Sequence, residues 1–152
     1  MREILFKAKR IDNGKWVEGY YYKISETTYC FKEDYERKPV PEHHYILQER
    51  MTDWGLPNQM VQIEIDPKTL CQFTGMTDKN GVRIWKNDIV EAWSQGSRAI
   101  GTVKQRVDGL WIMSPAWQNH EFWELKPNSN GETTVEVLVN AFDNPELLQE
   151  EH

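Results

Sequence analysis

Two adjacent histidines, His43 and His44, follow Glu42 and have the residue types of a metal site. Imidazole nitrogens and carboxylate oxygens are common metal ligands. In an extended chain, however, adjacent side chains point to opposite faces, so the two imidazoles cannot easily share one ion. Spaced pairs of the Cys-x-x-Cys or His-x-x-x-His kind are absent from the sequence. We therefore expect no metal site here.

A second pair, His120 and Glu121, has the residue types of a general acid and a general base. Such catalysis needs a pKa tuned by burial and a positioned partner. The sequence offers no Ser or Cys nucleophile in a recognisable elbow, and glycine patterns that bind phosphate are also absent. We interpret the pair as a surface turn, and we expect a protein that is not an enzyme and holds no cofactor.

Five aspartates could suggest carboxylate catalysis or Mg²⁺ binding. Each lies within a turn signature, where an Asp side chain is favoured because it bonds the nearby backbone. This structural explanation is sufficient for all of them. The five are Asp12, Asp78, Asp88, Asp108 and Asp143.

The strongest functional signal is a basic and aromatic stretch. Between residues 86 and 106, four basic residues stand against two acidic ones, whereas the whole chain has a net charge of −6. A surface with exposed Trp and flanking cations can stack bases and follow a phosphate backbone. Trp, Tyr and Arg also concentrate at protein interfaces. Nucleic-acid binding and protein binding are thus two interpretations of the stretch. A third interpretation is that the tryptophans lie in the core and the cations lie in solvent. The residues are Lys86, Arg98, Lys104 and Arg106, with Trp85, Trp93, Trp111, Trp117 and Trp123.

Within this set, Trp93 and Trp111 are expected in the core, and Trp117, which follows Pro115 and Ala116 in a loop, is expected to be exposed. A protein-binding function predicts a contiguous apolar or aromatic patch. Nucleic-acid binding instead predicts that the four cations cluster on one surface despite the negative total. The candidate interaction surface is therefore Trp117 with Lys86, Arg98, Lys104 and Arg106.

The elements that must position these residues are mainly β. In the first half, strands are expected at 4–9 and 16–23 around the turn Asp12-Asn13-Gly14, and loops at 33–41 and 51–58. Further strands are expected at 27–32, 45–48 and 60–65.

The second half contains three turn signals. Asn80-Gly81 suits a tight reversal that needs positive φ, Lys86-Asn87-Asp88 is a polar turn, and Asp108-Gly109 is a hairpin turn. Phe73 and Trp85 are expected to anchor the core. Strands are expected at 72–74, 82–85, 89–93, 99–107, 110–113, 122–125 and 133–140, the last with Val135, Val137 and Val139 on one face.

Five or six short strands joined by tight turns suit a small closed barrel. We expect a mainly β protein with an SH3-like barrel or roll at residues 70–142 and with N-terminal strands (residues 1–69) packed against it. A short helical tail is expected at 143–152, because Asn144, Pro145 and Glu146 have the types preferred at a helix start.

The stretch 72–90 resembles the YopX family of proteins encoded by phages and prophages of bacteria. The shared pattern is Gln-(Phe/Tyr)-Thr-Gly, then Asp-Lys-Asn-Gly, an aromatic residue and Asp-Ile-Val. Residues 2–20 and 135–148 resemble the family's opening and close, so the resemblance covers 1–152 as one unit. The chain departs from the family at Val139, often Gly, and at Lys86 and Asn87. The residues that carry the fold signature are Gly75, Asp78, Asn80, Gly81, Trp85 and Asp88.

The resemblance implies a small phage or prophage accessory protein, and the family has no secure biochemical role to transfer. We expect a non-enzymatic module that binds an unknown host or phage protein; the alternative is a nucleic-acid binder that uses the basic, aromatic barrel face. Because many short strands leave edges open to pairing, a homo-oligomer is also expected.

The composition is that of an ordinary folded cytoplasmic protein, and the resemblance implies a bacterial host cell. Among the 152 residues, 39% are hydrophobic and 28% are charged. No run approaches the roughly 18 to 20 apolar residues that span a bilayer, and Lys7 interrupts the apolar start, so no signal peptide is expected. Cys30 and Cys71 are expected to be reduced thiols in that compartment.

Overall fold

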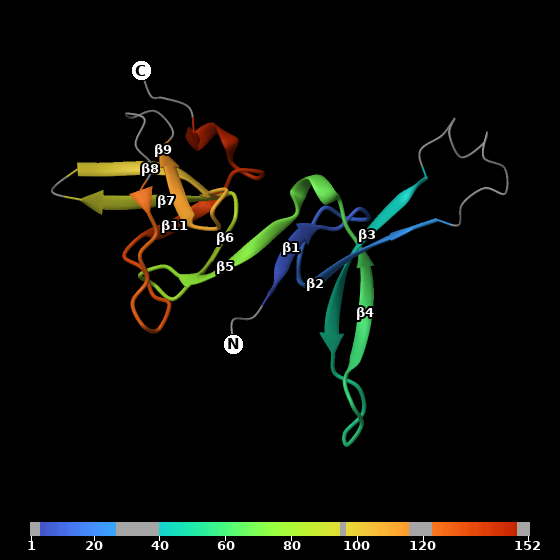
Figure 1. The fold of residues 1–152 in the computed structure, drawn as a ribbon. Helices are drawn as coiled ribbons and strands as arrows, with labels where there is room; N and C mark the ends of the chain where they lie inside the picture. Colours follow the sequence, from blue (N-terminus) through green and yellow to red (C-terminus); the bar gives the residue numbers. More distant parts are fainter. Residues whose placement is uncertain (1–3, 27–39, 95–96, 116–122, 149–152) are drawn as a thin grey trace. The chain divides into compact units, whose positions relative to one another are not determined.

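The computed structural model describes residues 4–26, 40–94, 97–115 and 123–148. These residues are mainly β, as the sequence predicts, and all strand pairs with a defined register are antiparallel (Figure 1). The chain divides into two compact units, which meet in sequence between Leu70 and Cys71. We call residues 5–70 the N-terminal unit and the part from residue 71 onward the C-terminal unit. The predicted strand at 27–32, Cys30, Trp117 and the pair His120–Glu121 lie outside the described residues.

The N-terminal unit is a meander of four antiparallel strands in the order β4-β3-β2-β1. Its turn at Gly14 has a φ of +70°, as the Asn-Gly pair predicts. Alternate side chains of the strands form one apolar cluster of Ala8, Val17, Ile46, Ile63 and Ile65. The unit ends in a short 3-10 helix, η1 (Pro67–Thr69). The strands are β1 (Phe6–Lys9), β2 (Trp16–Ser25), β3 (Glu42–Arg50) and β4 (Gln59–Glu64).

The C-terminal unit begins with a hairpin and continues as a five-stranded antiparallel sheet in the order β10-β9-β8-β7-β11. The hairpin pairs β5 (Cys71–Thr77) with β6 (Arg83–Trp85). A second turn, with Asn87 at a φ of +71°, leads into the sheet. The sheet strands are β7 (Asp88–Ser94), β8 (Ser97–Gln105), β9 (Trp111–Pro115), β10 (Trp123–Glu124) and β11 (Glu136–Asn140).

The strand pairings of this unit do not close into the barrel that the sequence predicts. β10 has two residues, which pair with β9, and β11 pairs with β7 at the opposite end of the order. In the described part of the chain, no ladder joins β10 to β11. The sheet is therefore open in its hydrogen bonding, although one apolar cluster extends across all of it. The cluster contains Met76, Ile84, Val90, Ala92, Ala99, Val103, Trp111, Met113, Leu125 and Val135.

The expected burial of Trp111 is confirmed, and that of Trp93 is wrong. Trp111 is 6% exposed, whereas Trp93 is 59% exposed. The reason is the twofold period of a strand: Ala92 is 6% exposed and belongs to the core cluster, so its neighbour Trp93 must point outward.

The expected single apolar face of the last strand is also wrong. Val137 pairs with Val90 and Val139 with Ile89, so the register shifts by one residue between the two valines. Because neighbouring residues of β7 point to opposite faces, the shift turns Val139 away from the side of Val137. Val137 accordingly packs against the core cluster.

The segment where a short helix is expected forms a 3-10 helix, η2 (Pro145–Leu148). In the described residues, no helix is both long enough and apolar enough to cross a membrane.

Candidate functional site

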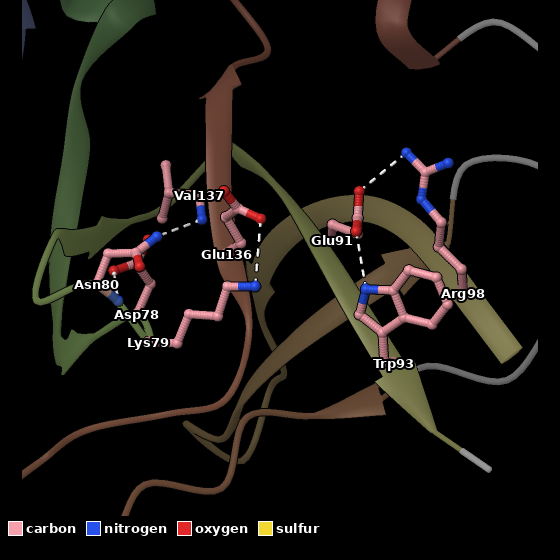
Figure 2. A network of polar contacts seen from close by, with 8 residues as sticks. All are labelled: Asp78, Lys79, Asn80, Glu91, Trp93, Arg98, Glu136 and Val137. Carbon is pink, nitrogen blue, oxygen red and sulfur yellow. Dashed lines mark hydrogen bonds and ion pairs between the residues drawn. The ribbon is translucent and has the colours of Figure 1, made fainter. Parts of the chain in front are cut away.

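Asp78 lies in the middle of the fold signature, and its carboxylate accepts hydrogen bonds from the backbone; Figure 2 shows those of Asn80 and Val137. Its Oδ1 accepts hydrogen bonds from the N–H groups of Asn80 and Val82, each at 2.8 Å. Its Oδ2 accepts the N–H of Val137 in β11 at 3.0 Å. The side chain is 2% exposed. One carboxylate therefore fixes the β5–β6 turn and ties it to a strand 59 residues later.

The glycine and aspartate positions around Asp78 confirm the turn chemistry that the sequence predicts. Gly75 and Gly81 have φ values of +83° and +81°. Asp88 is 2% exposed, and its Oδ2 accepts the N–H of Trp85 at 2.8 Å. Trp85 is buried against Phe73, with ring centroids 5.3 Å apart. Both buried carboxylates are thus bound to backbone donors, and the fold signature holds turns and core together.

The four cations proposed as a nucleic-acid surface differ in their surroundings. Arg98 Nη2 lies 2.9 Å from Glu91 Oε2, and Arg106 Nη2 lies 2.8 Å from Asp108 Oδ2. Lys104 is exposed on β8, and exposed Lys86 lies in the β6–β7 turn. Arg98 and Lys104 share a strand face, but six residues of strand separate them by about 20 Å.

Glu91 binds two neighbouring side chains at the outer surface of β7 and β8 (Figure 2). Its Oε1 accepts the indole N–H of Trp93 at 2.8 Å, and its Oε2 accepts Arg98. Trp93 and Arg98 are cross-strand partners. The Glu91 side chain is only 14% exposed, whereas Trp93 is 59% exposed. The result is a large aromatic ring that faces solvent and yet is held by a hydrogen bond and a cross-strand neighbour.

A pocket of about 300 Å³ lies beside this tryptophan; we call it the Trp93 pocket. Its apolar lining includes Met113, Leu125 and Val135 from the core cluster. Trp123 of β10 is a second tryptophan in the lining. Polar groups at the pocket come from Glu124, Lys126, Thr133 and Thr134. The lining thus combines an apolar floor, two tryptophan residues and several polar residues.

Sequence reasoning named Trp93 as a core residue and therefore missed it as a site residue. The signal that could have found it is the strand period. Glu91 and Trp93 are two residues apart, so both point to the same face of β7. A glutamate that faces outward predicts that the tryptophan also faces outward.

His43 and His44 point to different neighbours, as expected for adjacent residues of a strand. His43 lies between two carboxylates, with Nδ1 at 2.7 Å from Glu64 and Nε2 at 2.9 Å from Glu26. His44 Nδ1 is 2.7 Å from the hydroxyl of Tyr21 and its ring stacks on that residue. Among the described residues, no group of three or more His, Cys, Asp or Glu side chains has the arrangement of a metal site.

The pKa of His43 is raised, first by its hydrogen bond to Glu64 and then by the one to Glu26. A raised pKa means that the folded state binds the proton more tightly, so this contribution to stability is fully present below the unfolded pKa of about 6.5. This contribution is lost as the pH rises through the pKa of His43 in the folded state. We expect His43→Gln to lower the melting temperature more at about pH 5.5 than at about pH 8.5. The difference is expected to be small, because the site is exposed. A difference between the two proteins that is constant with pH would contradict this role.

Comparison with known proteins identifies a family and a similar solved structure. A family model described as YopX protein matches residues 5–149. No curated protein matches the chain. Among solved structures, the crystal structure of protein EF1440 from Enterococcus faecalis is similar over 98% of this chain and 100% of that chain, with 16% identity and a TM-score of 0.45.

Proposed function

The chain belongs to the YopX family, and from this premise we propose that it is a small phage or prophage accessory protein that acts in the bacterial cytoplasm as a non-enzymatic protein-interaction module. The observation that carries the proposal is the fixed, exposed ring of Trp93, a residue that also lines a pocket. Trp is the residue type most enriched where a few side chains carry most of the binding energy. A ring that is already held in place also loses little conformational freedom when a partner binds.

The pocket suits a side chain of a peptide or loop. Its volume of about 300 Å³ is at the lower end of ligand pockets, which range from about 300 to 1,000 Å³. The apolar floor of Met113, Leu125 and Val135 favours an apolar or aromatic residue of the partner. Thr133, Thr134 and Lys126 supply hydrogen-bonding groups for the polar backbone that flanks such a residue. The ligand class is therefore a short segment of a host or phage protein with an apolar anchor.

The non-enzymatic character of the proposal is supported by how the buried carboxylates are bound. Asp78 accepts three backbone N–H groups and Asp88 accepts that of Trp85. These interactions fix turns and give both carboxylates a structural role.

Binding of a peptide is tested by selecting ligands from a library of peptides derived from phage and host proteins. Trp93→Ala is expected to weaken binding of the selected peptides by about 30-fold, the loss of about 2 kcal/mol that defines an interface hot spot. Trp54→Ala is the matched control, because Trp54 is fully exposed in the N-terminal unit. Affinity is measured by fluorescence polarisation of labelled peptide. Equal affinities for the Trp93 and Trp54 variants would refute the assignment.

The alternative is a nucleic-acid binder that uses Trp93 and the cations of β8. Arg98 and Arg106 are each already engaged by a carboxylate, which weakens their attraction for phosphate. Polarisation assays with single- and double-stranded DNA and RNA at low salt separate the two functions. Salt-sensitive binding that is lost in Lys104→Ala would favour the alternative over the peptide module.

We also propose that the C-terminal unit is an SH3-like roll. Four consecutive strands form a meander, and the fifth returns to pair with the first, which gives the order β10-β9-β8-β7-β11. Both ends of this order contribute to the Trp93 pocket, through Trp123 and through Val135 just before β11. A sheet whose two ends both reach one pocket fits a partly open roll, with the pocket at its open side.

A further inference from the structure

The outer edge of β4 presents backbone groups to solvent in a regular pattern. The N–H of Ile65 bonds to the carbonyl of His44, which pairs the odd-numbered residues of this segment with β3. The even-numbered residues, Met60, Gln62 and Glu64, consequently direct their N–H and C=O groups away from β3. The carbonyl of Glu64 accepts the N–H of Ile11 at 3.2 Å, which confirms the direction. In the described part of the chain, β4 is the end of the N-terminal unit's strand order.

Over residues 59–63 no other described strand pairs with this edge, whereas its end at Glu64 is covered by Ile11 and by the bridge between Arg10 and Ile65. The uncovered part also lacks the usual protection against pairing. β4 has no Lys, Arg or Pro, and its one charged residue is Glu64 at the end of the strand. A groove of about 380 Å³ follows the edge, lined by residues 61–64, by the turn residues 10–12 and by Arg50. A groove along an unpaired strand accommodates one more extended strand.

We propose that the occupant is β4 of a second copy of this chain, paired antiparallel about a twofold axis. Met60 of one copy pairs with Gln62 of the other, and Val61 lies opposite Val61 of the second copy. Met60 and Gln62, whose backbone groups face outward, pair twice across the twofold axis. Each of the two pairs forms two backbone hydrogen bonds, which gives four in all. The numbers of paired residues differ by an even number in this register. Side chains from the same face of each sheet therefore lie on one face of the combined sheet. The pairs formed by Met60 and Gln62 lie before Glu64, whose outward carbonyl already accepts the N–H of Ile11.

The same arrangement explains exposed apolar side chains at both ends of the groove. The β3–β4 loop carries Met51, Trp54 and Leu56, which are 89%, 101% and 62% exposed. Ile11, at the other end of the groove, is 60% exposed. Antiparallel pairing carries the loop of one copy toward Ile11 of the other. A second copy therefore matches the edge in hydrogen bonding and covers apolar surface on both sides.

The test removes one backbone donor on the outer edge. Gln62→Pro deletes an N–H that β3 does not use, so the native sheet tolerates it as an edge proline. Gln62→Ala is the matched control: it loses the same side chain, including the contact of its Oε1 with the Tyr22 hydroxyl, but keeps the N–H. In sedimentation velocity, the parent chain and Gln62→Ala are expected to be dimers. Gln62→Pro is expected to dissociate about tenfold more readily or more. A monomeric parent chain, or equal dissociation constants for the two variants, would overturn the proposal.

A second measurement keeps the proposal testable if Gln62→Pro does not fold. In the proposed register the two Val61 residues form a directly opposed pair with Cα atoms about 4.5 Å apart, within the range of a disulfide. Val61→Cys is expected to form a covalent dimer under mild oxidation, read on a non-reducing gel. The parent chain, which has Cys30 and Cys71, is the control. No covalent dimer beyond that of the parent chain would rule out the register and the interface.

Discussion

Replacing Asp78 with alanine is expected to lower the free energy of unfolding of the C-terminal unit by about 3 kcal/mol. The substitution leaves the N–H groups of Asn80, Val82 and Val137 without their acceptor. Each buried donor left without a partner costs about 1 to 3 kcal/mol, less where water can reach it. Asn80 and Val82 lie in an exposed turn and Val137 is half-buried, so the sum lies well below three full penalties. Urea unfolding followed by tryptophan fluorescence measures the loss.

Two further variants separate hydrogen bonding from other effects at Asp78. Asp78→Asn keeps the shape but replaces one oxygen by an NH₂ donor, so it cannot accept all three N–H groups. It is expected to lose most of the same stability. Asp12→Ala removes an exposed turn aspartate bonded to Arg10 and is expected to lower the stability far less than Asp78→Ala. Similar losses for Asp12→Ala and Asp78→Ala would contradict the central role of Asp78.

Gly101→Ala is expected to destabilise the C-terminal unit by about 2 to 4 kcal/mol. Gly101 lies in β8 between Val90 of β7 and Pro115 of β9. A Cβ atom there would overlap the backbone carbonyl of Ser114 and the sulfur of Met113. The sulfur can move, but the carbonyl belongs to the neighbouring strand, so β8 and β9 must separate. Overpacking of this kind typically costs about 1 to 3 kcal/mol, and loss of strand pairing adds to it.

The control for Gly101 is Gly14→Ala in the β1–β2 turn. Gly14 has a φ of +70° and no atom within 4 Å of an added Cβ, so the substitution costs only backbone strain of about 1 kcal/mol. Met113→Ala combined with Gly101→Ala removes one of the two overlaps and should not restore the parent stability. A Gly101 variant that is no less stable than the Gly14 variant would show that the strands adjust freely.

The turns of this protein could be predicted because their chemistry is local. Gly14, Gly81 and Gly109 all have positive φ, and each follows an Asn or Asp in the sequence. The strands on either side follow from the polarity of a few consecutive residues. The division near residue 70 also coincides with a change from long N-terminal loops to closely spaced turns.

The candidate site could not be predicted in the same way, because it depends on contacts between distant residues. Asp78 accepts a hydrogen bond from the N–H of Val137, and the sequence around either residue does not predict that contact. The burial of a tryptophan in β7 depends on which face of the strand meets the core, and Ala92 takes that side instead of the larger Trp93. Closure of a barrel likewise depends on the pairing of the first and last strands, to which β10 contributes only two residues. Large side chains attract attention in a sequence, but the period of the strand decides where they point.

The chain is held by different contacts before and after the register shift in β11. Before the shift, Val137 is anchored by the core cluster and by Asp78. After it, Asn140 is the anchor: its Oδ1 accepts the N–H groups of Phe142 and Asp143, each at 2.9 Å. The described chain beyond Asn140 is therefore held by this side chain and by the N–H of Ala141, which donates to the carbonyl of Asn87 at 2.8 Å. A fluorescent label or an affinity handle attached at Phe142, which is 37% exposed, would report on the C-terminal unit without entering its core.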